Sequence, residues 1–128
     1  MSNWADLQKH MRHNYRPHDD EADMMSMIWS YESGRQQKIL IRRFSAAGHE
    51  MVEFKSAFAR LGDVEPLDML RDNVKLPLAT VALSGNVYLV VYNVLLTTLT
   101  IEAFDFVLSR VAAVADTLEE KYSVRDEF

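Results

Sequence analysis

The chain has 128 residues, a length that fits a single domain built around one core. It is 48% hydrophobic and 26% charged, which excludes disorder, and its net charge of −5 disfavours nucleic acid as a partner. The absence of cysteine excludes disulfides, thiolate catalysis and zinc–sulfur sites, and it is consistent with a reducing compartment.

Two further features bear on partners and location. The only local basic cluster consists of Arg35, Lys38, Arg42 and Arg43. We interpret it as a solvated strand face and not as a nucleic-acid site. Residues 1–15 carry charges and no apolar run, so no secretory signal is visible. The most apolar stretch, residues 87–101, is too short to span a bilayer, and a cytoplasmic protein without a membrane partner is expected.

The N-terminal part predicts a short helix and a polar connection. Its apolar residues recur at helical spacing, namely Trp4, Leu7 and Met11. A helix is therefore expected over residues 4–15, with Ser2 or Asn3 as its N-cap. Residues 16–21 are polar and contain Pro17, so they predict a connection.

Three strands are expected next, over residues 24–31, 37–44 and 50–58. The third alternates with period two, which places Val52, Phe54 and Phe58 on one face and charged residues on the other. Because the connections at residues 32–34 and 46–48 are short, the three strands are expected to form an antiparallel meander.

A second short helix is expected over residues 65–74. Pro66 suits its first turn, where a missing N–H is no loss, and Pro77 follows as a stop signal. Its apolar stripe consists of Leu67, Leu70 and Val74. Residues 78–83 and 87–92 then flank Ser84-Gly85-Asn86, which is a tight hairpin signal.

A long helix closes the pattern. Thr100 is suited to cap it, and Glu102 lies in its first turn, where the helix dipole stabilises a negative charge. Its apolar stripe consists of Phe104, Leu108, Val111, Ala115, Leu118 and Tyr122. The predicted order is α-βββ-α-ββ-α, an α+β fold with an antiparallel sheet and the long C-terminal helix packed on it. We divide the chain into residues 1–23, a helix and connection; residues 24–122, a single domain; and residues 123–128, a frayed tail.

The second hairpin has more apolar surface than one helix can cover. With Gly85-Asn86 as its loop, one face carries Ala79, Val81, Leu83, Tyr88, Val90 and Tyr92. The other carries Leu78, Thr80, Ala82, Leu89, Val91 and Asn93. An antiparallel sheet usually keeps one wetted face, so a partner subunit is expected to cover the second, which predicts a homodimer. The alternative is that the two short helices cover it within one chain.

The first strand suggests a surface for a partner protein. Its large side chains on one face are Met25, Met27, Trp29 and Tyr31. Because methionine-rich surfaces adapt to varied apolar partners, these four residues are a candidate partner-binding surface. The alternative is that they belong to the core.

Several stretches carry a resemblance to a known family. They are Gly62-Asp63-Val64-Glu65-Pro66-Leu67-Asp68-Met69-Leu70-Arg71-Asp72-Asn73, Leu76-Pro77-Leu78-Ala79, Val81-Ala82-Leu83-Ser84-Gly85-Asn86-Val87-Tyr88-Leu89 and Thr100-Ile101-Glu102-Ala103-Phe104. In these stretches and in its order of elements, the chain resembles the small chaperones of type III secretion and the related YbjN-type domains. The resemblance covers roughly residues 24–122.

The resemblance implies a compact, chaperone-like or regulatory dimer that binds protein segments without ATP. Family dimers often pair through the second helix and adjacent strands. Carried onto this chain, that gives a candidate dimer interface of Leu67, Leu70, Val74, Val81, Leu83, Tyr88 and Val90.

Motifs for chemistry are weak throughout. His10 and His13 would share a helix face near His18 and Asp19, but their spacing matches no established zinc motif, and we interpret them as a solvated N-terminus. No nucleophile elbow, P-loop or dinucleotide fingerprint is present. Around the second helix lie four carboxylates, Asp63, Glu65, Asp68 and Asp72, which we interpret as solvated surface. No catalytic residue, cofactor or metal ligand is predicted.

The leading hypothesis is a non-catalytic homodimer that holds a segment of a partner protein on apolar surface. A first alternative is a small-molecule or lipid-binding domain with a cavity between the sheet and the long helix, lined by Phe54, Tyr88 or Phe104. A second alternative is an enzyme with a metal site near the N-terminal histidines.

Overall fold

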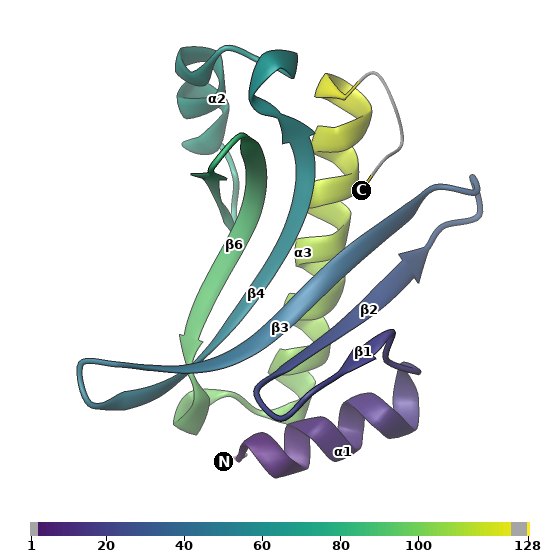
Figure 1. Ribbon diagram of the computed structural model, residues 1–128, viewed down its shortest axis with the longest axis vertical. Helices are drawn as coiled ribbons and strands as arrows, with labels where there is room; N and C mark the ends of the chain where they lie inside the picture. The colour runs from purple at the N-terminus through teal and green to yellow at the C-terminus, as the bar shows by residue number, and fades with distance from the viewer. Residues whose placement is uncertain (1–2, 124–127) are drawn as a thin grey trace.

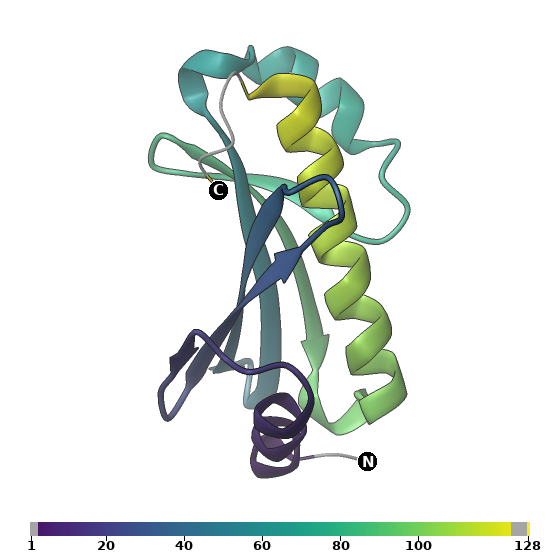
Figure 2. The same cartoon turned by 90° about the vertical axis from the view of Figure 1, so that its right-hand side faces the viewer.

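One long helix lies across one face of a six-stranded antiparallel sheet in the computed structural model, which describes residues 3–123 and 128 (Figures 1 and 2). The helices are α1 (Trp4–Asn14), α2 (Pro66–Asn73) and α3 (Ile101–Tyr122). The strands are β1 (Asp19–Asp20), β2 (Met24–Ser30), β3 (Gln36–Ala46), β4 (His49–Arg60), β5 (Thr80–Ser84) and β6 (Val87–Leu95). They lie in the order β1-β2-β3-β4-β6-β5. The α+β class, the antiparallel sheet and the packed C-terminal helix are confirmed.

The helix α1 follows its sequence signals closely. Asn3 caps it by accepting a hydrogen bond from the Asp6 backbone N–H at 2.8 Å. The predicted apolar residues Trp4, Leu7 and Met11 are all buried. The Trp4 indole N–H donates to the Ala22 carbonyl at 2.8 Å, which ties the helix to the following chain.

The strand β1 departs from the expected order of elements, since residues 16–21 were predicted as a connection only. Asp19 and Asp20 pair with Ser26 and Met25 of β2. The Ser26 hydroxyl donates to Asp19 Oδ2 at 2.5 Å and accepts from the Asp19 backbone N–H at 3.1 Å. Two aspartates carry no strand signal of their own, so this strand depends on its neighbour and not on local pattern.

The second hairpin has the predicted register. Val81 lies opposite Val90 and Leu83 opposite Tyr88, so one face of the hairpin joins the inner face of the sheet. Gly85 adopts a φ of 60° in the turn, a conformation that glycine takes without strain. The strand β6 pairs on its other side with β4, which places the hairpin at the edge of the sheet.

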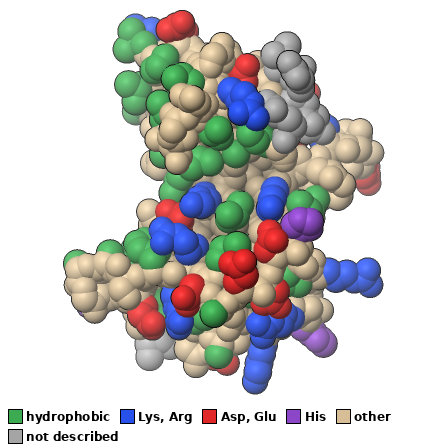
Figure 3. Space-filling model, in the orientation of Figure 1, with side chains coloured by type: hydrophobic (Ala, Val, Ile, Leu, Met, Phe, Trp, Pro, Cys, Tyr) green, Lys and Arg blue, Asp and Glu red, His purple; other side chains and the backbone are tan. Residues whose placement is uncertain are grey.

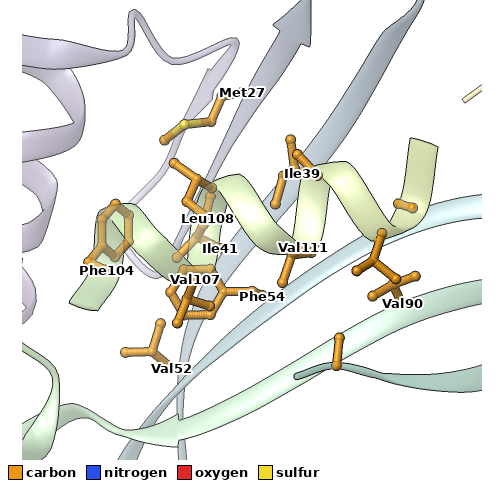
Figure 4. Packing of buried hydrophobic residues seen from close by; sticks show 14 of the residues in the cluster. Met27, Ile39, Ile41, Val52, Phe54, Val90, Phe104, Val107, Leu108 and Val111 are labelled. Atoms are coloured by element: carbon orange, nitrogen blue, oxygen red, sulfur yellow. The ribbon is translucent and has the colours of Figure 1, made fainter. Parts of the chain in front are cut away.

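The packing of α3 on the sheet forms the core. Thr100 caps the helix by accepting from the Ala103 backbone N–H at 3.0 Å. Five of the six residues of the predicted stripe are buried and Tyr122 is partly buried, so the helix prediction is confirmed. Figure 4 shows Phe104, Leu108 and Val111 meeting side chains of β2, β3 and β4. The rings of Phe54 and Phe104 lie 5.4 Å apart between centroids.

The second face of the sheet is not covered by a helix within the described part of the chain. Figures 1 and 2 place α1 at one end of the sheet and α2 beside β5 at the other, so the short helices do not cover this face as the alternative required. Leu40, Lys55 and Val91 lie side by side on it, and all three are half-buried. Figure 3 shows hydrophobic side chains interleaved with charged ones across this face.

Only part of the predicted tail, residues 123–128, can be compared with the structure, because residues 124–127 lie outside the described residues.

Replacing Phe104 with alanine tests the core. Phe104 is fully buried, and removing its ring from a packed core is expected to lower the free energy of unfolding by about 3–5 kcal/mol. Phe106→Ala on the same helix is the matched control, because Phe106 is 59% exposed and its loss is expected to change stability by about 0.5 kcal/mol or less. Urea unfolding followed by circular dichroism measures both, and equal effects would contradict the packing described.

Candidate functional site

The helix α2 turns its apolar stripe toward solvent. Pro66 opens the helix, and Met69 is the residue it buries, at 2% exposure. The predicted stripe of Leu67, Leu70 and Val74 lies on the other side, with exposed fractions of 60%, 64% and 84%. A short amphipathic helix normally buries such a stripe, so these three side chains form an apolar surface without a partner in this chain among the described residues.

An apolar groove lies between α2 and β5. It has a volume of about 230 Å³ and is lined by Pro66, Met69, Leu70, Asn73, Val81, Ala82, Leu83 and Tyr88. Both Leu70 and Leu83 line the groove and remain exposed, Leu83 at 47%, so the exposed side chains of the helix and the strand belong to one surface. We call the exposed residues Leu67, Leu70, Val74 and Leu83, together with this groove, the α2–β5 patch. In Figure 3 hydrophobic side chains gather at the upper left, where Figure 1 places α2.

Tyr88 forms a polar anchor within this apolar surrounding. Its ring is 3% exposed, and its hydroxyl donates to the Val64 carbonyl at 3.1 Å. Burial raises the pKa of Tyr88, and the negative charge of Glu65 adds to the rise. The hydroxyl therefore stays protonated and keeps its hydrogen bond, which holds the chain ahead of α2 against the sheet.

Asn73 joins α2 to the free edge of the sheet. Its side-chain Oδ1 accepts from the Val81 backbone N–H at 2.7 Å, and its Nδ2 donates to the Val81 carbonyl at 3.5 Å. A carboxamide at this position makes the two bonds that a neighbouring strand would make. Asn73 therefore blocks addition of a strand at Val81, a known hazard of exposed edges.

An ion pair fixes the end of α2 to the end of α3. The Lys121 ammonium lies 2.9 Å from Asp72 Oδ2. Since α2 buries one side chain only, this pair and the Asn73 bonds account for much of its placement.

The predicted dimer-interface residues divide into two groups. Leu67, Leu70, Val74 and Leu83 are exposed, and Val81 is half-buried in the groove wall. Tyr88 and Val90 are 3% and 0% exposed in the core of their own chain. The prediction that Tyr88 and Val90 are exposed interface residues is therefore wrong, because β6 turns both side chains inward under α3. Tyr88 still lines the groove.

Two of the four predicted partner-binding residues of the first strand are buried in the core. Met25 and Met27 are 0% and 2% exposed because β2 turns them toward α3, so the core alternative holds for both. Trp29 is half-buried and packs near Tyr15, with ring centroids 6.2 Å apart. Tyr31 is also half-buried, and burial raises the pKa of its hydroxyl, with the charge of Asp116 contributing. Strand periodicity alone could not reveal which face the long helix would take.

The basic cluster is matched by carboxylates. Its ion pairs are Arg35 with Asp116 and Glu119, Lys38 with Asp19, Arg42 with Glu53, and Arg43 with Asp23 and Glu50. A cation whose charge is already paired offers little to a phosphate backbone.

The prediction that the N-terminal histidines are solvated is wrong for His10. Its Nε2 donates to Asp105 Oδ1 at 2.7 Å, and the Tyr15 hydroxyl donates to the same oxygen at 2.6 Å. Burial and this hydrogen bond raise the pKa of Tyr15. The contact joins α1 to α3 across the sequence, which no local motif could indicate. No group of three metal-donating side chains is present within residues 3–123 and 128.

The acidic residues around α2 serve local structure. Asp63 accepts from the Arg60 backbone N–H at 2.9 Å, and Asp68 pairs with Arg71 on the helix surface. Asp72 is held by Lys121. Three of the four carboxylates around α2 are therefore engaged in local structural contacts.

No protein-family model matches the chain, and neither does the sequence of any curated protein. In the described part of the chain, no helix combines the length and the apolar character needed to cross a membrane.

Asn73→Ala tests how the groove is held. Loss of both hydrogen bonds to Val81 is expected to lower the free energy of unfolding by about 1–2 kcal/mol, measured by urea denaturation. Asn93→Ala is the control, because Asn93 is exposed on the open face, and its effect should stay below about 0.5 kcal/mol. An Asn73→Ala protein as stable as the control would mean that water replaces the carboxamide fully.

Proposed function

We propose that the protein is a non-catalytic, chaperone-like or regulatory protein-binding module of the cytoplasm that acts as a homodimer through the α2–β5 patch. The observation that carries this proposal is the exposure of Leu67, Leu70, Val74 and Leu83 on one surface beside an apolar groove. Burial of one such side chain stabilises by about 1.5–3 kcal/mol, so a second protein molecule gains substantially by covering four. Contiguous apolar patches of this kind mark interaction sites.

A second copy of the chain is the occupant we favour. A two-fold interface is isologous, so each copy brings the same four side chains and the same groove to the contact. The rim of the patch is nearly neutral, because Asp68 pairs with Arg71 and Asp72 with Lys121. Two identical surfaces therefore meet without a net charge repulsion.

The partner segment then binds on surface that the dimer leaves open. The uncovered face of the sheet carries half-buried aliphatic residues, among them Leu40, Leu89 and Val91. Arg42 and Lys55 both pair with Glu53 there, at 3.1 and 3.4 Å. A mixed face of apolar strips and paired charges suits an extended polypeptide, which offers both side chains and backbone groups.

The small-molecule alternative has weaker support. The α2–β5 groove, at about 230 Å³, lies below the range of roughly 300–1,000 Å³ that is typical of ligand pockets. A hollow of about 330 Å³ lies within that range, but it is on the uncovered face of the sheet and not under α3. Between the sheet and α3, where the alternative requires a cavity, the rings of Phe54 and Phe104 pack against each other and both are fully buried.

Light scattering behind size exclusion on untagged protein tests the dimer. The wild type is expected at twice the chain mass of 14.8 kDa. Leu70→Glu is expected to give a folded monomer, because it sets a charge on each copy at the centre of the apolar contact and Leu70 is 64% exposed in the free chain. Phe106→Glu introduces the same charge at a position 59% exposed on α3 and should leave the dimer intact. A wild type that stays monomeric at high concentration contradicts the proposal.

A further inference from the structure

The sheet is split between two of its central strands. β3 and β4 pair from Ala46 with His49 to Leu40 with Lys55, and the pairing ends there. Beyond this point β3 continues beside β2 and β4 continues beside β6. Figure 1 shows the two strands diverging with α3 visible between them. The sheet therefore contains a notch whose two walls are strands that no longer bond to each other.

Side chains replace part of the missing strand pairing. The Gln37 amide Nε2 donates to Ser56 Oγ at 2.8 Å and to the Ala57 carbonyl at 2.6 Å. The Ser56 hydroxyl donates to the Lys38 carbonyl at 2.6 Å. Gln37 and Ser56 are fully buried, and Gln37 Oε1 has no hydrogen-bond partner within the described residues. The polar bridge keeps the notch from closing into a regular ladder, because its side chains occupy the space between the strands.

Phe128 lies at the edge of this notch. Together with Ile28, Lys38, Leu40 and Ala57 it lines one hollow of about 330 Å³, so open space remains beside it. These four residues come from β2, β3 and β4, and they lie on the uncovered face of the sheet. Figures 1 and 2 show the C end of the chain on the side of the sheet away from α3. We call the hollow bounded by Ile28, Lys38, Leu40 and Ala57 the β3–β4 notch.

Two polar contacts hold the residue at the notch. The Phe128 backbone N–H donates to Glu119 Oε2 at 3.0 Å. Glu119 is 1% exposed, and its other oxygen accepts from Arg35 Nη2 at 3.1 Å, so the carboxylate is fixed in place. The guanidinium carbon of Arg60 lies 5.7 Å from the centre of the Phe128 ring, within range of a cation–π contact.

None of these contacts depends on the ring belonging to the same chain. The notch offers an apolar slot for a side chain, a cation near the ring and a buried carboxylate that accepts a backbone N–H. An aromatic residue within any extended segment supplies the same three complementary groups. A tethered occupant has a high effective concentration, so it excludes weak competitors and yields to stronger ones.

We propose that the β3–β4 notch is a docking slot for one aromatic residue of an extended protein segment, and that Phe128, which lines the hollow, competes with partner segments for it. The inference rests on the proposed function in that the partner is a protein. It identifies the kind of side chain recognised and the part of the uncovered face that recognises it. It does not require the dimer.

The test uses the full chain carrying Phe128→Ala and a fluorescein-labelled peptide, Ser-Val-Arg-Asp-Glu-Phe, with the sequence of residues 123–128. Fluorescence anisotropy is expected to show binding to the variant roughly tenfold or more tighter than to the wild type, because the tethered competitor is gone. A peptide with alanine in place of phenylalanine should not bind. Equal binding of the first peptide to variant and wild type, or equal binding of the two peptides to the variant, overturns the proposal.

Second substitutions in the Phe128→Ala chain locate the contact. Leu40→Glu should abolish peptide binding, whereas Phe106→Glu, which introduces the same charge at an exposed position on α3 outside the notch, should retain it. Circular dichroism verifies that both remain folded. In ¹⁵N-labelled Phe128→Ala protein, the amide signals of Leu40 and Ala57 should move from their wild-type positions and return toward them as peptide is added. Signals that do not move on substitution overturn the proposal even where the peptide is too weak for anisotropy.

The two proposals fail separately. A monomer that binds the peptide through the notch contradicts the dimer and retains the docking slot. A dimer whose Phe128→Ala variant neither binds the peptide nor shifts the notch signals overturns the slot and leaves the dimer standing.

Discussion

The packing of one helix on one face of the sheet is the constraint on which the rest of the structure depends. The stripe of α3 covers the inner face of the central strands, with Phe104 and Phe54 in direct contact. Because α3 covers that face, Met25 and Met27 are core, and within the described part of the chain no helix lies over the opposite face. A single helix covers only a limited width of sheet, and Leu83 in the edge hairpin β5–β6 remains 47% exposed. The exposed surfaces of this protein follow from how far α3 reaches.

Local patterns predicted those parts of the fold that depend on neighbours in sequence. The Asn3 and Thr100 caps, the stripe of α3 and the register of the second hairpin all repeat within a few residues. What the sequence could not reveal depends on contacts between distant segments. The strand β1 forms because Ser26 of the neighbouring strand hydrogen-bonds to it. His10 is hydrogen-bonded to Asp105, which lies far along the chain. The candidate site shows the same limit. The sequence predicted the apolar stripe of Leu67, Leu70 and Val74, but it did not predict that the stripe faces solvent. That orientation follows because α2 buries Met69 instead.

The candidate surfaces differ in how their backbone is protected. At the free edge, Asn73 takes the place of a strand at Val81 and leaves a side-chain surface for contact. Within the sheet, Gln37 and Ser56 bridge β3 and β4 by side-chain hydrogen bonds beyond the point where their backbone pairing ends. In both places carboxamide side chains make the bonds of an absent strand. Simple strand addition is therefore disfavoured at both places.

The end of α3 joins the two surfaces. Glu119 binds the Phe128 backbone at the notch, and Lys121, two positions further, binds Asp72 at the end of α2. Both side chains start from the last turn of α3, so this one turn contacts both α2 and the residue that lines the notch. One turn of α3 therefore contributes a side chain to each of the two surfaces that we propose for binding, the α2–β5 patch through Asp72 and the notch through Phe128.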